Sequence, residues 1–154
     1  MQQFFFAQKA FIVHEGALLL VRKSAADPNQ AGRWEVPGGR MDFGEDVDPH
    51  LIREVREEVG MEIRPDRPFY VWQWQLHRTN RDGQAVHMQI VAVARLCHAT
   101  TREVTAEHRV EEDYLGETEW VPFSRVREYD LIPNMVPVIE AFLELPEIRR
   151  MPAQ

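Results

Sequence analysis

The apolar positions of this chain recur mostly in short runs or at every second residue, which is the spacing of β-strands. The stretch 69–77 alternates most clearly, because Tyr70, Trp72, Trp74 and Leu76 share one face. Turn residues such as Gly and Asn separate the runs. The patterns predict strands at residues 4–14, 17–22, 34–36, 38–41, 69–77, 85–97 and 119–121.

Helical periodicity is found at 47–59 and at 134–145, with a shorter helix expected at 123–129. In the first helix the core-facing positions follow the 3.6-residue repeat, at Leu51, Ile52, Val55 and Val59.

We expect Asp48 to be the N-cap of this first helix, Pro49 to occupy its first turn and Gly60 to end it.

The remaining segments are polar or contain proline, so we expect connections at 23–33, 62–67 and 100–116 and a loosely held tail from Pro146 onwards. Strands mixed with two main helices predict an α/β protein with a mixed sheet between helices. At 154 residues we expect one domain over 1–154.

The polar side of the first helix carries Glu54, Glu57 and Glu58 within an arc of about 100°. Neighbouring carboxylates repel one another, and a hard divalent cation such as Mg²⁺ or Mn²⁺ removes that repulsion. The alternative is a solvated acidic face that is paired with Arg53 and Arg56. Helical spacing alone leaves both interpretations open.

The loop before this helix begins with Pro37, Gly38 and Gly39. A Gly-Gly pair lets the backbone approach a metal or a phosphate closely, although it also suits an ordinary turn. The net charge of −7 argues against a nucleic-acid-binding surface. Small phosphate ligands remain compatible with it, because a bound cation reverses the local field.

Cys97 is the single cysteine, so neither a disulfide nor a cysteine metal site is expected. No apolar run is long enough for a membrane span, and the first residues do not resemble a signal peptide. We therefore expect a cytoplasmic protein that does not bind membranes.

Together, residues 39–61 resemble the Nudix box, G-x5-E-x7-R-E-U-x-E-E-x-G-U, in which U is a bulky apolar residue. Every defined position matches, and a chance match is on the order of one in a billion per window. The matching residues are Gly39, Glu45, Arg53, Glu54, Val55, Glu57, Glu58, Gly60 and Met61.

This resemblance implies a Nudix-like α/β/α sandwich and metal-dependent hydrolysis of a nucleoside diphosphate linked to another moiety. It implies that Glu57 and Glu58 are the main Mg²⁺ ligands, with Mn²⁺ as a possible substitute. It also implies that the carbonyl of Gly38 is a further ligand and that Glu54 is either a ligand or the general base. A catalytic role for Arg53 is implied as an orienting partner.

The resemblance also implies structural roles in the box for Gly39, Glu45 and Gly60, with Glu45 as a partner of Arg53. Many Nudix enzymes use one more acid from a late loop. Glu112 is the preferred candidate among five acids, the others being Glu103, Glu107, Glu111 and Asp113.

Candidate substrate contacts are Trp34, Trp72 and Trp74, which suit base stacking, and Arg40. The competing interpretation is that the tryptophans pack the sheet. The expected partner is a small nucleotide, and a homodimer is possible. A nucleoside triphosphate and a nucleotide sugar remain open as substrates, and the alternative function is a catalytically silent nucleotide-binding or regulatory module.

Overall fold

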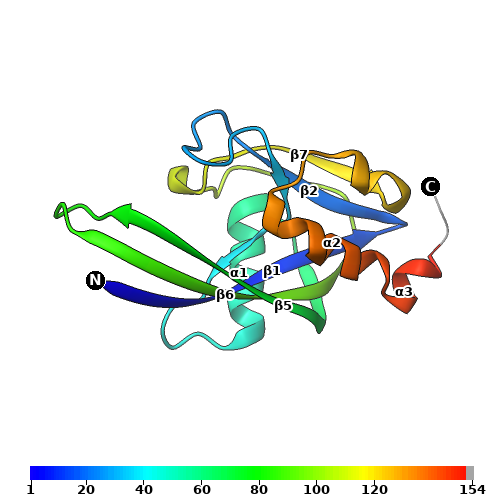
Figure 1. Ribbon diagram of the computed structural model, residues 1–154. Helices are drawn as coiled ribbons and strands as arrows, with labels where there is room; N and C mark the ends of the chain where they lie inside the picture. The colour runs from blue at the N-terminus through cyan, green and yellow to red at the C-terminus, as the bar shows by residue number, and fades with distance from the viewer. Residues whose placement is uncertain (152–154) are drawn as a thin grey trace.

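The computed structural model describes residues 1–151, which form one seven-stranded sheet with helices on both faces (Figure 1). The strands are β1 (Gln2–His14), β2 (Ala17–Lys23), β3 (Trp34–Glu35), β4 (Gly38–Arg40), β5 (Ile63–Thr79), β6 (Ala85–Ala99) and β7 (Leu115–Pro122). The helices are α1 (Val47–Val59), α2 (Val136–Leu143) and α3 (Pro146–Arg149), with 3-10 turns η1 (Glu111–Asp113), η2 (Phe123–Glu128) and η3 (Pro133–Met135).

The sheet is mixed, as expected. Its strand order is β3-β2-β1-β6-β5, with β4 paired to β1 and β7 paired to β2. Only β1 and β6 run parallel. β1 and β2 pair at Val13↔Leu18 and His14↔Ala17. Closer to the N-terminus of β1, residues 7–9 pair with β4 instead. This pairing brings the glycine-rich strand β4 to the middle of the sheet.

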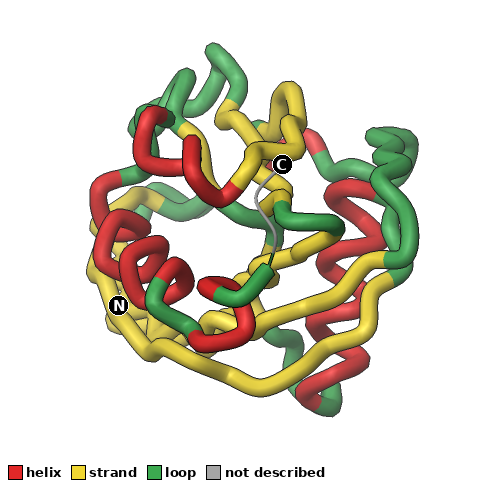
Figure 2. The backbone as a smooth tube through the Cα atoms, turned by 90° about the vertical axis from the view of Figure 1, so that its right-hand side faces the viewer, coloured by secondary structure: helices red, strands yellow, loops and turns green. Residues whose placement is uncertain are grey.

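The two faces of the sheet are covered by different helices, which makes the fold an α/β/α sandwich (Figure 2). On one face Ala10, Ile12 and Leu19 pack against the apolar stripe of α1, in which Leu51, Val55 and Val59 are fully buried. On the other face Phe11, Leu18 and Leu96 pack with Val138, Ile139 and Phe142 of α2. The alternation of β1 thus supplies both cores.

A third apolar cluster fills the extended hairpin of β5 and β6, which projects together with the N-terminal part of β1 (Figure 1). Val86, Met88 and Ile90 are buried there, with Trp72 and Trp74 packed against them. The face predicted for 69–77 is therefore confirmed as the inner face of this hairpin.

Strand β5 corrects one expectation, because it begins at Ile63 and includes most of the segment expected to be a connection. Its register shifts between Pro65 and Pro68 and again between Pro68 and Tyr70. β5 lies at the edge of the sheet, where proline removes no ladder hydrogen bond from a neighbour. The prolines therefore produce irregularities in the strand instead of ending it.

The ends of two helices also differ from expectation. The N-cap of α1 is Asp46, and Asp48 lies inside the helix, where its carboxylate pairs with Arg95 at 2.8 Å. Gly60 ends α1 as expected, with φ of 65°. The tail from Pro146 was expected to be loosely held, yet it forms α3 and buries Ile148. The last three residues of that tail, 152–154, lie outside the described part of the chain.

Candidate active site

The acidic side of α1 is more buried than helical periodicity suggests. Glu58 is 4% exposed and Glu54 is 9% exposed, whereas Glu57 is about a third exposed. The simple solvated-face interpretation is wrong for two of the three. Arg56, offered there as a partner, is turned away and pairs with Glu62 at 2.8 Å.

Burial changes the acidity of the two inner carboxyls. It raises the pKa of Glu58 to about 8, although the nearby Lys9 ammonium and the Gly38 N–H oppose the rise. Burial likewise raises the pKa of Glu54 to about 7, with Arg53 opposing and Glu57 adding to the rise. Both groups therefore titrate near neutral pH in the protein without metal.

Strand β4 brings the backbone of the glycine pair to these carboxyls. The N–H of Gly38 donates a 2.7 Å hydrogen bond to Oε2 of Glu58. Gly38 has φ of 145°, and a Cβ there would lie 2.2 Å from the carbonyl oxygen of Gln8. A Cβ at Gly39 would lie 2.6 Å from Oε2 of Glu54. Glycine is required at both positions because side chains there would collide with the backbone of β1 and with the Glu54 carboxyl.

Arg53 lies at the centre of an ion-pair network on the outer side of the site. Its guanidinium donates to Glu45 at 2.7 and 2.8 Å and to Glu57 at 3.2 and 3.3 Å. It also lies 3.3 Å from Glu54. Hydrogen bonding to Arg53 and to the N–H of Asp42 lowers the pKa of Glu45 to about 2. Arg53 therefore restrains the rotamers of its acidic neighbours.

The late loop brings an acid to the site, but the geometry favours Asp113 over Glu112. Glu112 is exposed, whereas Asp113 is partly buried and burial raises its pKa, with Glu57 adding to the rise. The loop is tied down because Arg109 donates to the carbonyls of Glu58 at 2.7 Å and Gly116 at 2.6 Å.

Residues that sequence reasoning missed form a buried charge cluster beside Glu58. Lys9 of β1 donates to Oε1 of Glu35 at 2.5 Å, and Lys23 of β2 lies 3.0 Å from Oε2. Lys23 also donates to the carbonyl of Asp113 at 2.9 Å. The available signal was the polar pair Gln8-Lys9, which interrupts an otherwise apolar strand.

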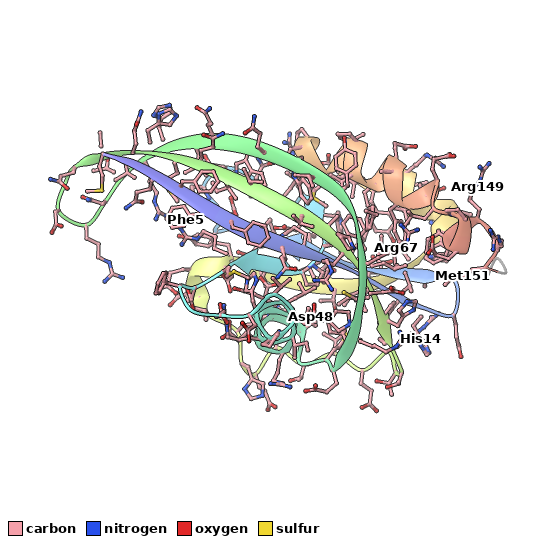
Figure 3. All side chains as sticks on the ribbon, turned by 90° about the horizontal axis from the view of Figure 1, so that it is seen from below. Phe5, His14, Asp48, Arg67, Arg149 and Met151 are labelled. Atoms are coloured by element: carbon pink, nitrogen blue, oxygen red, sulfur yellow. The ribbon has the colours of Figure 1, made fainter. Side chains whose placement is uncertain are left out.

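The four candidate substrate residues are placed differently from one another. Trp34 is 8% exposed and packs edge-on against Tyr129 in the α2 core, which leaves little ring surface for a ligand. Trp72 and Trp74 are partly buried on the inner face of the hairpin, with ring centroids 6.2 Å apart. Arg40 is exposed and stacks over the ring of Phe5, which Figure 3 labels on β1.

The donor set suits a hard divalent cation, because carboxylate and carbonyl oxygens are what Mg²⁺ prefers. Within residues 1–151 no three His, Cys, Asp or Glu side chains converge tightly enough to enclose an ion. Glu57 is engaged by Arg53 and Glu58 by the N–H of Gly38. The cluster therefore requires rotation of a side chain before it can surround a cation.

The chain matches the family model of the NUDIX domain over residues 7–142. The CTP pyrophosphohydrolase of Escherichia coli (strain K12) is 30% identical over 136 residues, which is 88% of this chain and 89% of the relative. The family model and this relative together identify a pyrophosphohydrolase of the Nudix class. The chain belongs to the Nudix family, and it is a hydrolase.

Solved structures agree with the fold. The MutT protein from Methanosarcina mazei Go1 superposes with a TM-score of 0.69 at 21% identity, covering 92% of this chain and 94% of that one. A MutT Nudix hydrolase from Burkholderia pseudomallei superposes with a TM-score of 0.61 at 26% identity, covering 90% and 97%. Among the helices of residues 1–151, none has the length and apolar character needed to cross a bilayer.

Proposed function

We propose that this protein hydrolyses a pyrophosphate bond in a nucleoside triphosphate, with Mg²⁺ as the cofactor and Mn²⁺ as a substitute. The observation that carries the proposal is the burial of Glu54 and Glu58 against the backbone of Gly38 and Gly39. Desolvated carboxyls are costly to keep charged without a partner, and a divalent cation supplies that partner.

Glu57 and Glu58 would hold the cation, together with the carbonyl of Gly38, which leaves Glu54 for the proton. When bound, such an ion neutralises phosphate oxygens and acidifies a water molecule. The chain supplies the alignment: the N–H of Gly38 orients Glu58, and Arg53 orients Glu57. Mutation of a group that hydrogen-bonds to a metal ligand typically lowers metal affinity or activity by about 10- to 100-fold.

Glu54 is the best-suited general base within the box. In the protein without metal, burial raises the pKa of Glu54 to about 7, and a base with a pKa near neutrality combines availability with useful strength. Asp113 is the further acid that we assign to the late loop, in place of Glu112. It is held beside the cluster by the contact of Lys23 with its carbonyl. Either carboxylate accepts a proton from the attacking water.

A triphosphate is favoured over a nucleotide sugar because a relative that covers most of the chain is a CTP pyrophosphohydrolase. We place the base over the inner face of the hairpin near Phe5, Trp72 and Trp74, with Arg40 at its border. Within the described residues the buried indole N–H of Trp72 has no hydrogen-bond partner. It is a candidate donor to a polar atom of the base.

The alternative, a silent nucleotide-binding module, makes a different prediction. It would bind nucleotides without releasing products, although the chain keeps every defined residue of the box. A nucleotide panel with Mg²⁺ separates these possibilities, with CTP and the other triphosphates beside nucleotide sugars. Pyrophosphate or phosphate release is the readout, measured with added pyrophosphatase or phosphatase.

We expect the triphosphates to give a monophosphate and pyrophosphate, with no turnover in excess chelator. Turnover in ¹⁸O-labelled water should place the label in one phosphate product, because water is the nucleophile. Preference for nucleotide sugars would correct the substrate class. Binding without turnover across the panel would support the silent module.

A further inference from the structure

His50 lies in the first half of α1, outside the defined positions of the box, and is fully buried. A buried imidazole normally has a hydrogen-bond partner on each nitrogen that carries a proton. Here Nδ1 is contacted at 2.8 Å by the side-chain amide of Gln8 on β1. Nε2 is buried and has no hydrogen-bond partner among residues 1–151.

The orientation of the Gln8 amide is determined by its two other contacts. Its Oε1 accepts a 3.0 Å hydrogen bond from Arg95, which has only donors to offer. Its Nε2 donates at 2.7 Å to the carbonyl of Val47, which can only accept. Amide oxygen and nitrogen therefore cannot be exchanged without losing both hydrogen bonds.

This orientation determines the tautomer of His50. The second N–H of the Gln8 amide points at Nδ1, so Nδ1 must accept and cannot carry a proton. A neutral imidazole with a bare Nδ1 carries its proton on Nε2.

The resulting Nε2–H faces the site, because Nε2 lies 3.9 Å from Oε1 of Glu54 one turn along α1. A movement of about 1 Å would bring this pair to hydrogen-bond distance. The far end of the chain of contacts is also fixed. Arg95 pairs with Asp48, which is labelled beside α1 in Figure 3, and donates to the carbonyl of Asp66.

We propose that His50 is a positioning residue for Glu54: the contacts Arg95–Gln8–His50 hold a neutral imidazole whose Nε2–H donates to the Glu54 carboxylate during turnover. The catalytic part of this inference rests on the proposed function, in which Glu54 takes part in the reaction. The tautomer itself does not. The other charged groups near Glu54 include two cations, Arg53 and Lys9, and three carboxyls, Glu57, Glu58 and Asp113.

The first test is the tautomer, read by long-range ¹H–¹⁵N correlation spectra of the ¹⁵N-labelled full chain without metal. We expect a proton on Nε2 and a bare Nδ1 for His50, assigned by comparison with His50→Gln. Gln8→Leu removes the N–H that faces Nδ1, so the tautomer with the proton on Nδ1 should also be populated in this variant. A proton on Nδ1 of His50 in the unaltered protein would overturn the proposal.

The second test separates positioning from packing. His50→Leu fills the site without a donor and should lower kcat about tenfold, whereas His50→Gln retains an N–H and should stay within about threefold. KM should change little in both. His14→Gln is the control, because His14 contacts the carbonyl of Ala99 and lies outside the chain of contacts from Arg95 to His50. If His50→Leu retains normal kcat while folded, positioning is wrong.

Failure of the proposed function has a different signature. In that case the unaltered protein shows no metal-dependent turnover on any nucleotide, while the tautomer of His50 can still be measured. If Nδ1 of His50 carries no proton but the protein shows no turnover, the hydrogen bonds from Arg95 to His50 are supported and only their role in catalysis is rejected. If His50→Leu and His50→Gln have equal kcat, the positioning role of His50 is rejected, whereas the proposed hydrolase function is not.

Discussion

The backbone N–H of Gly38 donates a 2.7 Å hydrogen bond to the Glu58 carboxylate, which joins strand β4 to helix α1 across 20 residues of sequence. This contact holds the glycine-containing strand and the helix of the box in a defined relative position. It also explains why a buried acid is tolerated there.

Glu57→Gln and Glu58→Gln should each lower kcat/KM by at least about 10³-fold, because loss of a metal ligand removes several kcal/mol of charge stabilisation. The unfolding temperature in chelator should not fall. In Glu58→Gln an amide oxygen still accepts from the Gly38 N–H, and Glu57→Gln removes a negative charge from beside Glu54. Steady-state rates and thermal melts measure the two effects.

The matched control for these variants is Glu62→Gln, at an exposed glutamate that pairs with Arg56. It should retain normal rates. If the two active-site variants melt much earlier than the unaltered protein in chelator, the glutamates have a structural role and the ligand assignment is wrong.

Arg53→Ala should lower kcat by about 10- to 100-fold, as expected for a partner that orients metal ligands. Its guanidinium contacts Glu45 and Glu57, so its loss frees the rotamer of Glu57. Arg56→Ala is the matched control on the outer side of the same helix. Equal rates for the two alanine variants would contradict the orienting role.

Without metal, stability should fall as the pH rises from about 5 to 8. The pKa of Glu58 is raised from 4.5 to about 8 and that of Glu54 to about 7. In this window the folded state holds more protons than the unfolded state, so raising the pH favours unfolding. Melting temperatures in chelator across this range provide the measurement.

Metal should reverse this trend, because a cation replaces the protons that Glu54 and Glu58 hold at low pH. The rise in melting temperature on adding Mg²⁺ should therefore be larger at pH 8 than at pH 6. In Glu58→Gln, the fall in stability with pH in chelator should be shallower. A Mg²⁺ effect that is independent of pH would contradict the raised pKa values.

Asp113→Asn should lower kcat by at least about tenfold, whereas Glu112→Gln should remain within about twofold. Asp113 is partly buried next to the cluster, and Glu112 is exposed to solvent. Loss of a positioned general acid or base typically lowers the rate by about 10²-fold or more. A water molecule can take over part of the proton transfer, so we expect a smaller loss here. The reverse ranking of the two variants would restore Glu112 as the late-loop acid.

Cys97→Ala should keep its turnover, since the thiol is fully buried and burial raises its pKa to about 12. A thiol in that state is a poor nucleophile. The variant should lose about 1 kcal/mol of stability through the small cavity it creates. A folded Cys97→Ala protein without activity would point to a covalent intermediate and reject attack by water.

Much of the fold could be predicted because local patterns carry it. The alternation from Tyr70 to Leu76 predicted the inner face of β5, and the stripe of Leu51, Val55 and Val59 predicted the buried face of α1. The beginning of β5 could not be predicted, since Pro65 and Pro68 normally interrupt a strand. Only the position at the sheet edge, which no local pattern encodes, makes them tolerable.

The sequence by itself determined the family and the set of carboxylates, because the spacing from Gly39 to Met61 is too specific to arise by chance. The tertiary structure alone decided how those carboxylates behave. Burial of Glu54 and Glu58, the partial burial that leads us to propose Asp113 instead of Glu112, and the contacts of His50 all depend on strands and loops distant in the chain. The physical reason is that desolvation and hydrogen-bond direction are properties of packed neighbours, which helical spacing does not contain.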